Sequence, residues 1–291
     1  MSKNVLVLGG TGFLGSFVAR NLQCEGFTVR IMARHLKKAH GMFDNSFEIV
    51  PGDANSAEDV CKALEGCDGA HISLSESNEL TGVRNVVAAK DANLRHITYV
   101  SGATVDESHA WFPMIADKLR AEEVVRNSGV PYTIFCPTWF IEMVNNNFIQ
   151  GNRAIILGKH RTPYHWLAAD DFGRMVARAY QTESAYNKRL CILGPEALSM
   201  HEVLKRVCAR LHPQITSVTT IPLWMAWLIA HITGNSRLME ASRLMAYFDK
   251  IGVETMCDSA AANAILGAPS TTLDQWLAAQ VMSRTRGSSQ N

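Results

Sequence analysis

A glycine-rich turn near the start of the chain has the residue types and spacing of a phosphate-binding loop. An apolar run over residues 5–8 leads into four glycines, and residues 16–22 continue with helical spacing of apolar positions. The glycines are Gly9, Gly10, Gly12 and Gly15. They satisfy the fingerprint G-x-G-x-x-G and its wider variant G-x-x-G-x-x-G, in which the amino end of a helix presents backbone N–H groups to a pyrophosphate. The sequence therefore predicts a dinucleotide-binding turn, with an ordinary strand–helix turn as the alternative.

A basic segment follows the next predicted strand, where dinucleotide-binding folds read the ribose. The strand covers residues 28–33, and its end lies roughly 20 residues beyond the glycines. An acid there would accept hydrogen bonds from the ribose hydroxyls of NADH. This chain has Arg34 and then Lys37, and a guanidinium pairs bidentately with a 2′-phosphate. We therefore expect NADPH as the cofactor, and the alternative is a solvated basic loop.

Composition and charge limit the classes of function. The chain has 291 residues, of which 47% are hydrophobic and 19% charged, so it can bury a large core. A net charge of +1, without a basic stripe that contains aromatic residues, argues against a nucleic-acid partner. The seven cysteines are dispersed and have no metal-ligand spacing. We interpret them as buried or free thiols in a reducing compartment, and we expect no metal.

The start of the chain and its apolar runs bear on location. The first predicted strand begins within a few residues of Met1, which leaves no room for a signal peptide. No apolar run reaches the roughly 18 residues of a transmembrane segment. We expect a cytoplasmic protein.

Strands and helices alternate through the first half of the chain. This alternation predicts an α/β fold with a Rossmann-type, doubly wound parallel sheet. The predicted strands are residues 5–8, 28–33, 47–50, 69–74, 96–100 and 131–137. After residue 137 the alternation ends. We expect an NAD(P)-binding domain over residues 1–150 and a smaller α+β cap over residues 151–291, part of which packs back on the sheet.

One apolar stretch, from Ile221 to Ile232, is long enough for a helix and too short to cross a bilayer. Because it is apolar nearly all round, a buried core helix is the favoured interpretation. A hydrophobic wall over a substrate pocket and an interfacial or subunit contact, as in a homo-oligomer, are the alternatives.

Several motifs together resemble the NmrA-like type of atypical short-chain dehydrogenase/reductase. They lie at residues 9–15, 52–53, 82–89, 99–101, 128–133, 169–173 and 193–199. The resemblance covers about residues 3 to 280, and its amino-terminal motifs are the specific part. Members of that family include NAD(P)H reductases of small molecules, quinone reductases, relatives of a respiratory complex I subunit, and regulators that bind a dinucleotide without turning it over.

The resemblance implies a set of cofactor contacts. The pyrophosphate would lie against Gly9, Thr11, Gly12, Phe13 and Leu14. Arg34 would bind the 2′-phosphate. The adenine, ribose and nicotinamide ends would be contacted by Asp53, Ala54, Ser73, Leu74, Ser101, Lys118, Pro137 and Thr138.

The sequence departs from the family pattern at the proton donor. A standard member carries Tyr-x-x-x-Lys on the helix after the Ser101 strand, and the lysine lowers the pKa of the phenol. Here the lysine is Lys118, and Met114 stands four residues before it. The spacing puts both residues on one helix face, yet methionine cannot transfer a proton; a solvated lysine is the alternative role for Lys118. Other candidate acids are Tyr99, Tyr164, His109 and His165.

These observations predict an NADPH-dependent reductase of a small apolar carbonyl, enone or quinone, with Lys118 and Ser101 as the catalytic residues. The expected substrate pocket contains Met114, Trp139, Phe140, Tyr164 and Trp224. The alternative is a binding protein that uses NADPH as a structural or sensing ligand. Epimerase or dehydratase chemistry on a nucleotide sugar is disfavoured because it normally requires the tyrosine.

Overall fold

The computed structural model describes residues 3–74, 76–89, 93–160, 162–251 and 257–288. The chain forms two compact units that alternate along the sequence. The first, here called the sheet unit, comprises Met1–Pro137, Ala169–Ile192 and Met256–Pro269; the second, the cap unit, contains the remaining residues. The expected division into domains at residue 150 stays a prediction.

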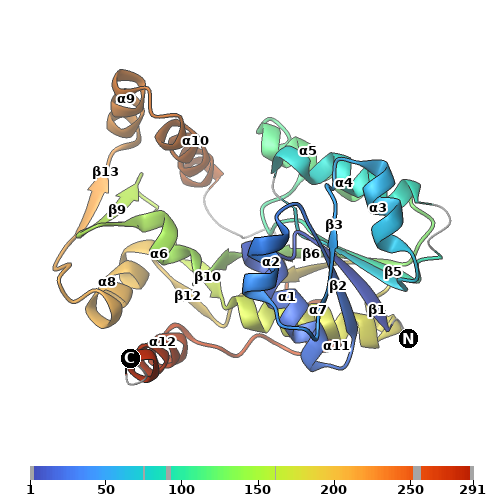
Figure 1. Cartoon of the computed structure of the whole chain (residues 1–291). Helices are drawn as coiled ribbons and strands as arrows, with labels where there is room; N and C mark the ends of the chain where they lie inside the picture. Colours follow the sequence, from blue (N-terminus) through green and yellow to red (C-terminus); the bar gives the residue numbers. More distant parts are fainter. Residues whose placement is uncertain (1–2, 75, 90–92, 161, 252–256, 289–291) are drawn as a thin grey trace. The chain divides into compact units, whose positions relative to one another are not determined.

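Seven parallel strands form the centre of the sheet unit (Figure 1). They are β1 (Asn4–Leu8), β2 (Thr28–Ala33), β3 (Glu48–Pro51), β4 (Gly69–Ile72), β5 (His96–Val100), β6 (Tyr132–Pro137) and β11 (Lys188–Ile192). Their order is β3-β2-β1-β4-β5-β6-β11. The chain moves outward from β1 through β2 to β3, then returns to the other side of β1 as β4. The order therefore reverses between β1 and β4, which is where open α/β sheets bind ligands.

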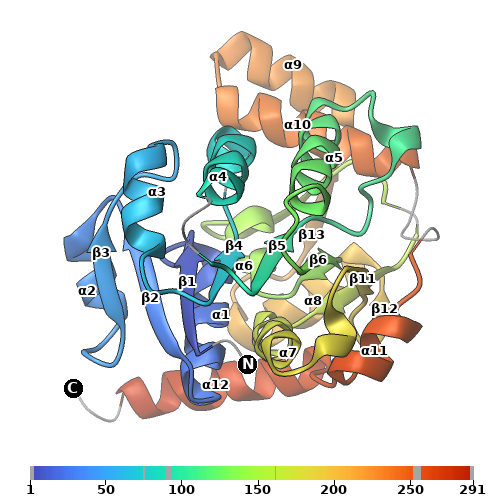
Figure 2. The ribbon, with the colours of Figure 1, turned by 90° about the vertical axis from the view of Figure 1, so that its right-hand side faces the viewer.

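Helices cover both faces of this sheet (Figures 1 and 2). The helices of the sheet unit are α1 (Phe13–Cys24), α2 (Leu36–Met42), α3 (Ala57–Leu64), α4 (Glu76–Ala88), α5 (Pro113–Arg126), α7 (Ala169–Gln181) and α11 (Ala260–Leu266). Helices α1 and α7 pack against each other on one face, and α3, α4 and α5 lie side by side on the other. With the small sheets of the cap unit, this arrangement confirms the Rossmann-type α/β fold.

Burial explains why these strands form the centre of the unit. Residues 5–8 of β1 and all five residues of β5 are buried. Strands that are covered on both faces are apolar without alternation, as β1 is. Helix α3 shows the complementary pattern, since Ser56 caps it by accepting a hydrogen bond from Asp59 N while Val60 and Leu64 face the core.

The cap unit contains two small sheets and a group of helices. One sheet has the order β12-β10-β7 and the other β13-β9-β8. The strands are β7 (Trp139–Phe140), β8 (Ile149–Gln150), β9 (Arg153–Leu157), β10 (Tyr164–Leu167), β12 (Glu196–Leu198) and β13 (Val218–Ile221). The helices are α6 (Met143–Phe148), α8 (Met200–Leu211), α9 (Leu223–Thr233), α10 (Ser236–Ile251) and α12 (Leu273–Ser288).

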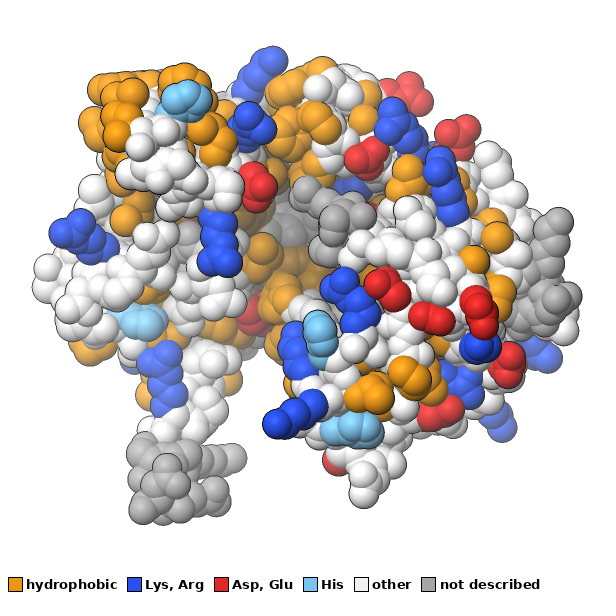
Figure 3. Space-filling view, turned by 45° about the horizontal axis from the view of Figure 1, so that its top comes forward, with side chains coloured by type: hydrophobic (Ala, Val, Ile, Leu, Met, Phe, Trp, Pro, Cys, Tyr) orange, Lys and Arg blue, Asp and Glu red, His pale blue; other side chains and the backbone are white. Residues whose placement is uncertain are grey.

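Helix α9 corrects the expectation of a buried core helix between Ile221 and Ile232. Only Ala226 and Ala230, one turn apart, are buried along this helix. Trp224, Trp227 and Ile232 are 65%, 49% and 77% exposed, and Figure 3 shows hydrophobic side chains gathered over α9. Helix α10 packs against α9, yet Ala226 and Ala230 are the only buried residues of α9. The apolar composition indicated a tendency toward burial but not how much partner surface the unit supplies.

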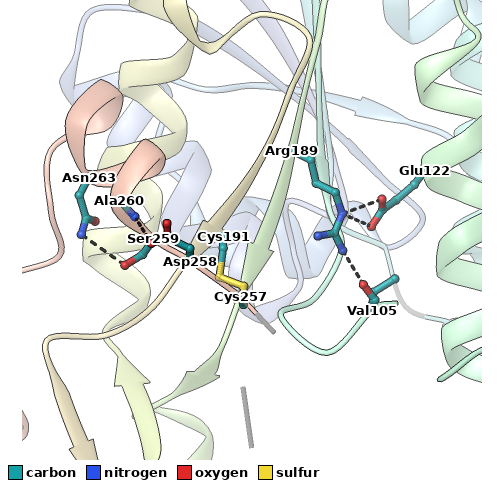
Figure 4. The surroundings of a disulfide bond; sticks show 9 residues. All are labelled: Val105, Glu122, Arg189, Cys191, Cys257, Asp258, Ser259, Ala260 and Asn263. Atoms are coloured by element: carbon teal, nitrogen blue, oxygen red, sulfur yellow. Dashed lines mark hydrogen bonds and ion pairs between the residues drawn. A yellow bond between two sulfur atoms is a disulfide. The ribbon is translucent and has the colours of Figure 1, made fainter. Parts of the chain in front are cut away.

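A disulfide between Cys191 and Cys257 corrects the expectation that all the cysteines are thiols. Cys191 lies in β11, and Cys257 precedes α11 (Figure 4). Both cysteines belong to the sheet unit, although 66 positions separate them in the sequence. No sequence spacing predicts such a pair, because the packing of α11 against β11 brings the two cysteines together.

Two histidines are fully buried within the parallel sheet. His71 Nδ1 lies 2.8 Å from Thr98 Oγ1, and His96 Nε2 lies 2.8 Å from Thr133 Oγ1. Burial lowers the pKa of each imidazole to about 3, because an apolar interior disfavours the charged form. Both rings are therefore neutral in the folded protein at physiological pH.

This burial predicts acid sensitivity of the sheet unit. Because the folded-state pKa lies below that of the unfolded chain, the unfolded state binds protons first as the pH falls from about 6.5 toward 3, and stability decreases over that window. At pH 5 each histidine should lower the free energy of unfolding by up to about 2 kcal/mol relative to pH 7. Urea unfolding at the two pH values measures the change. His96→Gln should remove about half of it, while the exposed His35→Gln should retain it all; an unfolding free energy that is equal at both pH values in the wild type would contradict the argument.

Candidate functional site

A cleft of about 240 Å³ lies at the carboxyl ends of β1, β2 and β4, where the strand order reverses. Its walls come from the glycine turn, the ends of β2 and β4, and the start of α4. The lining residues are Gly9, Thr11, Gly12, Met32, Ala33, Arg34, Lys38, Gly52, Asp53, Ala54, Ser73, Leu74 and Asn78. All of them belong to the sheet unit.

The turn after β1 requires glycine for two separate reasons. Gly9 has a φ of +81°, which L side chains rarely adopt, and a Cβ there would lie 1.9 Å from the backbone oxygen of Ser73. A Cβ at Gly15 would lie 2.3 Å from the Gly9 oxygen. These two glycines therefore allow the turn and the first turn of α1 to lie directly against the end of β4.

Gly12 has a different role, because its backbone conformation is open to any residue. It is the N-cap of α1, with φ −85° and ψ 177°, and no side chain caps that helix end. A Cβ on Gly12 would lie 3.0 Å from the Gly9 oxygen, a tight contact but one to a single atom. The amino end of α1 thus opens toward the cleft with its positive dipole end and no side chain at Gly12, an arrangement that fits the phosphates of a dinucleotide.

Two basic side chains lie on the β2 side of the cleft. Arg34 follows β2 and is exposed, so its guanidinium is available to a ligand. Lys38 lies on α2 and donates to the Thr11 oxygen over 2.9 Å, which attaches it to the glycine turn. Lys37 is the residue that the sequence predicts for this position. The structure brings Lys38 to the cleft, one position further along the same short helix.

Most of the expected cofactor contacts come together here. Eight of the expected residues line the cleft: Gly9, Thr11, Gly12, Arg34, Asp53, Ala54, Ser73 and Leu74. Phe13 and Leu14 begin α1 directly after Gly12. Asn78 also lines the cleft, although no sequence motif predicts it. Its side-chain oxygen accepts a hydrogen bond from Asn55 Nδ2 over 2.7 Å. This bond connects the start of α4 to the loop after β3.

Lys118 is held in a buried polar cluster in the same unit. Its Nζ lies 2.7 Å from Oε1 of Glu79, a carboxylate on α4 that is almost fully buried. The Tyr99 hydroxyl donates to the same oxygen over 2.7 Å. Burial and the nearby Glu79 carboxylate hold the pKa of Tyr99 well above its usual value. Lys118 is therefore an ion-paired lysine rather than a solvated one.

Ser101, which directly follows β5, belongs to a second buried cluster. The centre of this cluster is Glu122, one turn beyond Lys118 on α5. The Ser101 hydroxyl donates to Glu122 over 2.5 Å. The same carboxylate pairs with Arg126 at 2.6 Å and with Arg189 at 2.9 Å (Figure 4 shows the Arg189 pair). The Ser101 proton is directed at Glu122, so in this arrangement the hydroxyl can accept a hydrogen bond but cannot donate one to a substrate oxygen.

Met114 stands where the family pattern has its tyrosine. It lies in the first turn of α5, and Lys118 follows one turn later on the same helix. Met114 is half-buried. The helix therefore preserves the spacing of the Tyr-x-x-x-Lys pattern, but the residue at the tyrosine position cannot donate a proton. Pro137, at the end of β6, accepts a hydrogen bond from the amide of Ala103 over 2.9 Å.

The four substitute acids all have partners within their own units. Tyr99 binds Glu79, as described above, and Tyr164 lies with its hydroxyl 2.8 Å from His160 Nδ1. The Nδ1 atoms of His109 and His165 each lie 2.9 Å from a backbone oxygen, those of Thr104 and Gly194. These contacts give each side chain a structural use, and catalysis by any of them stays a prediction.

The expected pocket residues of the cap unit lie in different environments. Phe140 and Tyr164 are buried in the core of that unit, and Trp139 stands among aromatic rings, with its centroid 4.8 Å from that of Phe248. Trp224 is exposed on α9. Thr138 is the first cap-unit residue after β6. Contact of these residues with a substrate stays a prediction.

Neither a metal site nor a membrane span is found in the part of the chain that the structure describes. Within those residues, no cluster of three or more histidine, cysteine or acidic side chains is arranged to bind a metal ion. None of the described helices combines the length and the apolar character needed to cross a bilayer.

Sequence relatives have two kinds of described role. The photosystem II assembly factor Ycf39 of Trieres chinensis is 25% identical over 244 residues, which cover 79% of this chain and 76% of the relative. An NAD(P)H azoreductase of Xenophilus azovorans is 24% identical over 211 residues, covering 70% and 73%. The sequence thus resembles both an assembly factor and a reductase.

Solved structures of reductases share the fold over nearly the whole chain. Citrobacter triphenylmethane reductase, solved with NADP(H), superposes with a TM-score of 0.76 at 18% identity, covering 96% of this chain and 99% of that one. An NADPH-dependent quinone oxidoreductase of Escherichia coli, solved with NADPH, gives a TM-score of 0.71 at 18% identity, covering 95% and 99%. The model of the NmrA-like family matches residues 1–277, so the chain belongs to the NmrA-like family.

Proposed function

We propose that this protein is an NADPH-dependent reductase of a small apolar carbonyl, enone or quinone, and that enones and quinones are its better substrates. The observation that carries the proposal is the cleft lined by Gly12, at the amino end of α1 where no side chain caps the helix, together with Arg34 and Lys38. A helix amino terminus suits a pyrophosphate, and paired cations suit an additional phosphate on the ribose. The NADP(H) and NADPH in the two reductase structures support the same cofactor.

Different residues of the sheet unit bind different parts of the cofactor. The N–H groups after Gly12 bind the pyrophosphate, and Arg34 with Lys38 binds the 2′-phosphate, where Lys37 stays a further candidate. Lys118 donates to the sugar near the nicotinamide end. When bound, NADPH supplies a hydride, and the protein contributes orientation and electrostatics. A cytoplasmic location stays a prediction.

The class of substrate that can accept the hydride depends on which side chains can donate a proton. Met114 cannot give a proton to an oxygen, and the Ser101 proton is directed at Glu122. A simple ketone needs a proton at its oxygen as the hydride arrives, because charge builds on that one atom. An enone or quinone delocalises the incoming charge, so water can supply the proton later. The residues at this site therefore suit conjugated acceptors better than simple ketones or alcohols.

A second candidate is a non-catalytic NADPH-binding protein that senses the cofactor or assembles with a partner. Two observations favour it: the exposed apolar side chains of α9, which are suited to an interfacial or subunit contact, and the similarity to Ycf39 assembly factors. A homo-oligomer that uses this helix belongs to the same candidate.

The glycine turn supplies the first test of the cofactor site. Gly12→Val should weaken NADPH binding at least about tenfold, because the side chain occupies the phosphate approach and removes charge-assisted hydrogen bonds. The melting temperature without ligand should change little, since Gly12 has an ordinary φ and the one close neighbour of a Cβ there is the Gly9 oxygen, at 3.0 Å. Calorimetric titration and thermal melting measure the two quantities. Gly41→Ala, at an open position on α2, is the control and should bind normally; a Gly12→Val protein that binds NADPH like the wild type would remove the turn from the proposed site.

Arg34 sets the expected preference for NADPH. Arg34→Asp should lose about 1.5–3 kcal/mol of NADPH binding, roughly 10- to 100-fold in affinity, and should gain NADH binding through the ribose hydroxyls. Titration of both cofactors checks the reversal. Lys38→Ala should weaken NADPH binding more than Lys37→Ala, because Lys38 lines the cleft. Equal affinities of the wild type for NADPH and NADH would contradict the assignment.

The acceptor class is tested with a substrate panel. Loss of NADPH absorbance should occur with enones and quinones and be slight with simple ketones, and alcohols with NADP should give little reaction. Met114→Tyr restores Tyr-x-x-x-Lys and should raise turnover of ketones and alcohols, since general acid–base catalysis contributes about 100-fold or more. Phe112→Tyr, which adds a phenol outside that spacing, is the control. Tight NADPH binding without turnover of any acceptor would favour the non-catalytic candidate, and rapid oxidation of alcohols by the wild type would identify another acid.

A further inference from the structure

Glu79 is a carboxylate that is buried between α4, β5 and α5. Its side chain is 4% exposed, and that of its partner Lys118 is 16% exposed. Oε1 of Glu79 accepts hydrogen bonds from Lys118 Nζ and from the Tyr99 hydroxyl, each over 2.7 Å. A charged group removed from water is unfavourable unless it is paired and hydrogen-bonded, and Glu79 has both kinds of contact.

These contacts fix the direction of the Lys118 ammonium. Lysine is a flexible side chain with three rotatable N–H donors and no intrinsic direction. Here one donor is taken by Glu79, and Val100 O, at 3.4 Å, stands near a second. The ammonium also lies 5.8 Å from the centre of the Tyr99 ring. A lysine held from several sides presents its remaining donor in one direction.

The cluster is continuous with the cofactor cleft. Glu79 directly follows Asn78, whose side chain lines the cleft at the start of α4. Val100 is the last residue of β5, so the lysine lies at the same carboxyl edge of the sheet as the glycine turn. Two consecutive residues of α4 therefore serve the two places: Asn78 lines the cleft, and Glu79 binds Lys118.

We infer that Glu79 is a positioning residue: it holds Lys118 for the sugar hydroxyls of bound NADPH and neutralises the ammonium at that end of the site. The inference rests on the proposed function, because it needs NADPH in the cleft. A positioning role and a purely electrostatic role of Glu79 predict opposite changes in NADPH affinity when its charge is removed. Removing a negative charge near a polyanionic cofactor should tighten binding by Coulomb attraction, whereas removing a positioning contact should weaken it.

The test is the dissociation constant of NADPH for Glu79→Gln, measured by calorimetric titration. The amide keeps the size of the side chain and removes its charge. We expect binding to weaken about tenfold, the change in affinity that accompanies loss of a charge-assisted hydrogen bond. Glu123→Gln, at an exposed position of α5, is the matched control and should leave the affinity unchanged.

A double-mutant cycle with Lys118→Met separates positioning from a general effect on folding. If Glu79 acts through the lysine, Glu79→Gln should have no further effect on NADPH affinity once Lys118 is replaced. A purely structural role would give the same change in both backgrounds and would overturn the inference. Tyr99→Phe, which keeps the ion pair but removes the third partner, provides a second measurement should Glu79→Gln fail to fold. It should weaken binding about threefold, and unchanged affinity in that variant would overturn the inference as well.

The outcomes distinguish this inference from the proposed function. A wild-type protein that binds NADPH, with Glu79→Gln of equal or higher affinity, would overturn the positioning role alone. A wild-type protein that does not bind NADPH would overturn both.

Discussion

The close approach of two backbone segments, at the ends of β1 and β4, is the constraint on which the site depends. Gly9 at φ +81° leaves no room for a Cβ beside the Ser73 oxygen, and Gly15 leaves none beside Gly9 itself. Because both positions lack side chains, the turn lies directly on the edge of the sheet, and α1 begins there with Gly12 facing the cleft. A larger residue at Gly9 or Gly15 would move α1 away from the ends of β1 and β4, and the glycine turn would no longer line the cleft.

The parts that could be predicted from the sequence are those whose signal is local. Runs rich in apolar and β-branched residues predicted six of the seven parallel strands. Residues 5–8 of β1 are apolar without alternation, because a strand covered on both faces needs no polar side. The glycine spacing and the position of Arg34 predicted the turn and its basic neighbour, since both depend on the distance from β1 and β2 along the chain. Lys38 lines the cleft and donates to the Thr11 oxygen, a contact between α2 and the glycine turn that spacing along the chain does not encode.

The parts that could not be predicted depend on contacts between distant positions. Glu79 and Lys118 are 39 residues apart, and the two cysteines of the disulfide are 66 apart. An acid on α4 looks like any solvated helix residue until the fold places α5 beside it. Helix α9 shows the converse. Its composition predicts burial, but burial requires an opposing surface, and although α10 packs against α9, only Ala226 and Ala230 of that helix are buried.

The electrostatics of the Lys118 end bear on which chemistry the site can support. A free ammonium would stabilise negative charge on a substrate oxygen, as an oxyanion site does. Here a carboxylate at 2.7 Å already compensates that charge, so the pair offers direction and one hydrogen-bond donor rather than net positive potential. Buried ion pairs also add little net stability, because desolvation offsets much of the attraction. Under the proposed function, the main consequence of the Glu79–Lys118 pair would therefore be orientation of the cofactor. A reductase site that supplies neither an acid nor a strong positive field would favour acceptors that spread the incoming charge over a conjugated system.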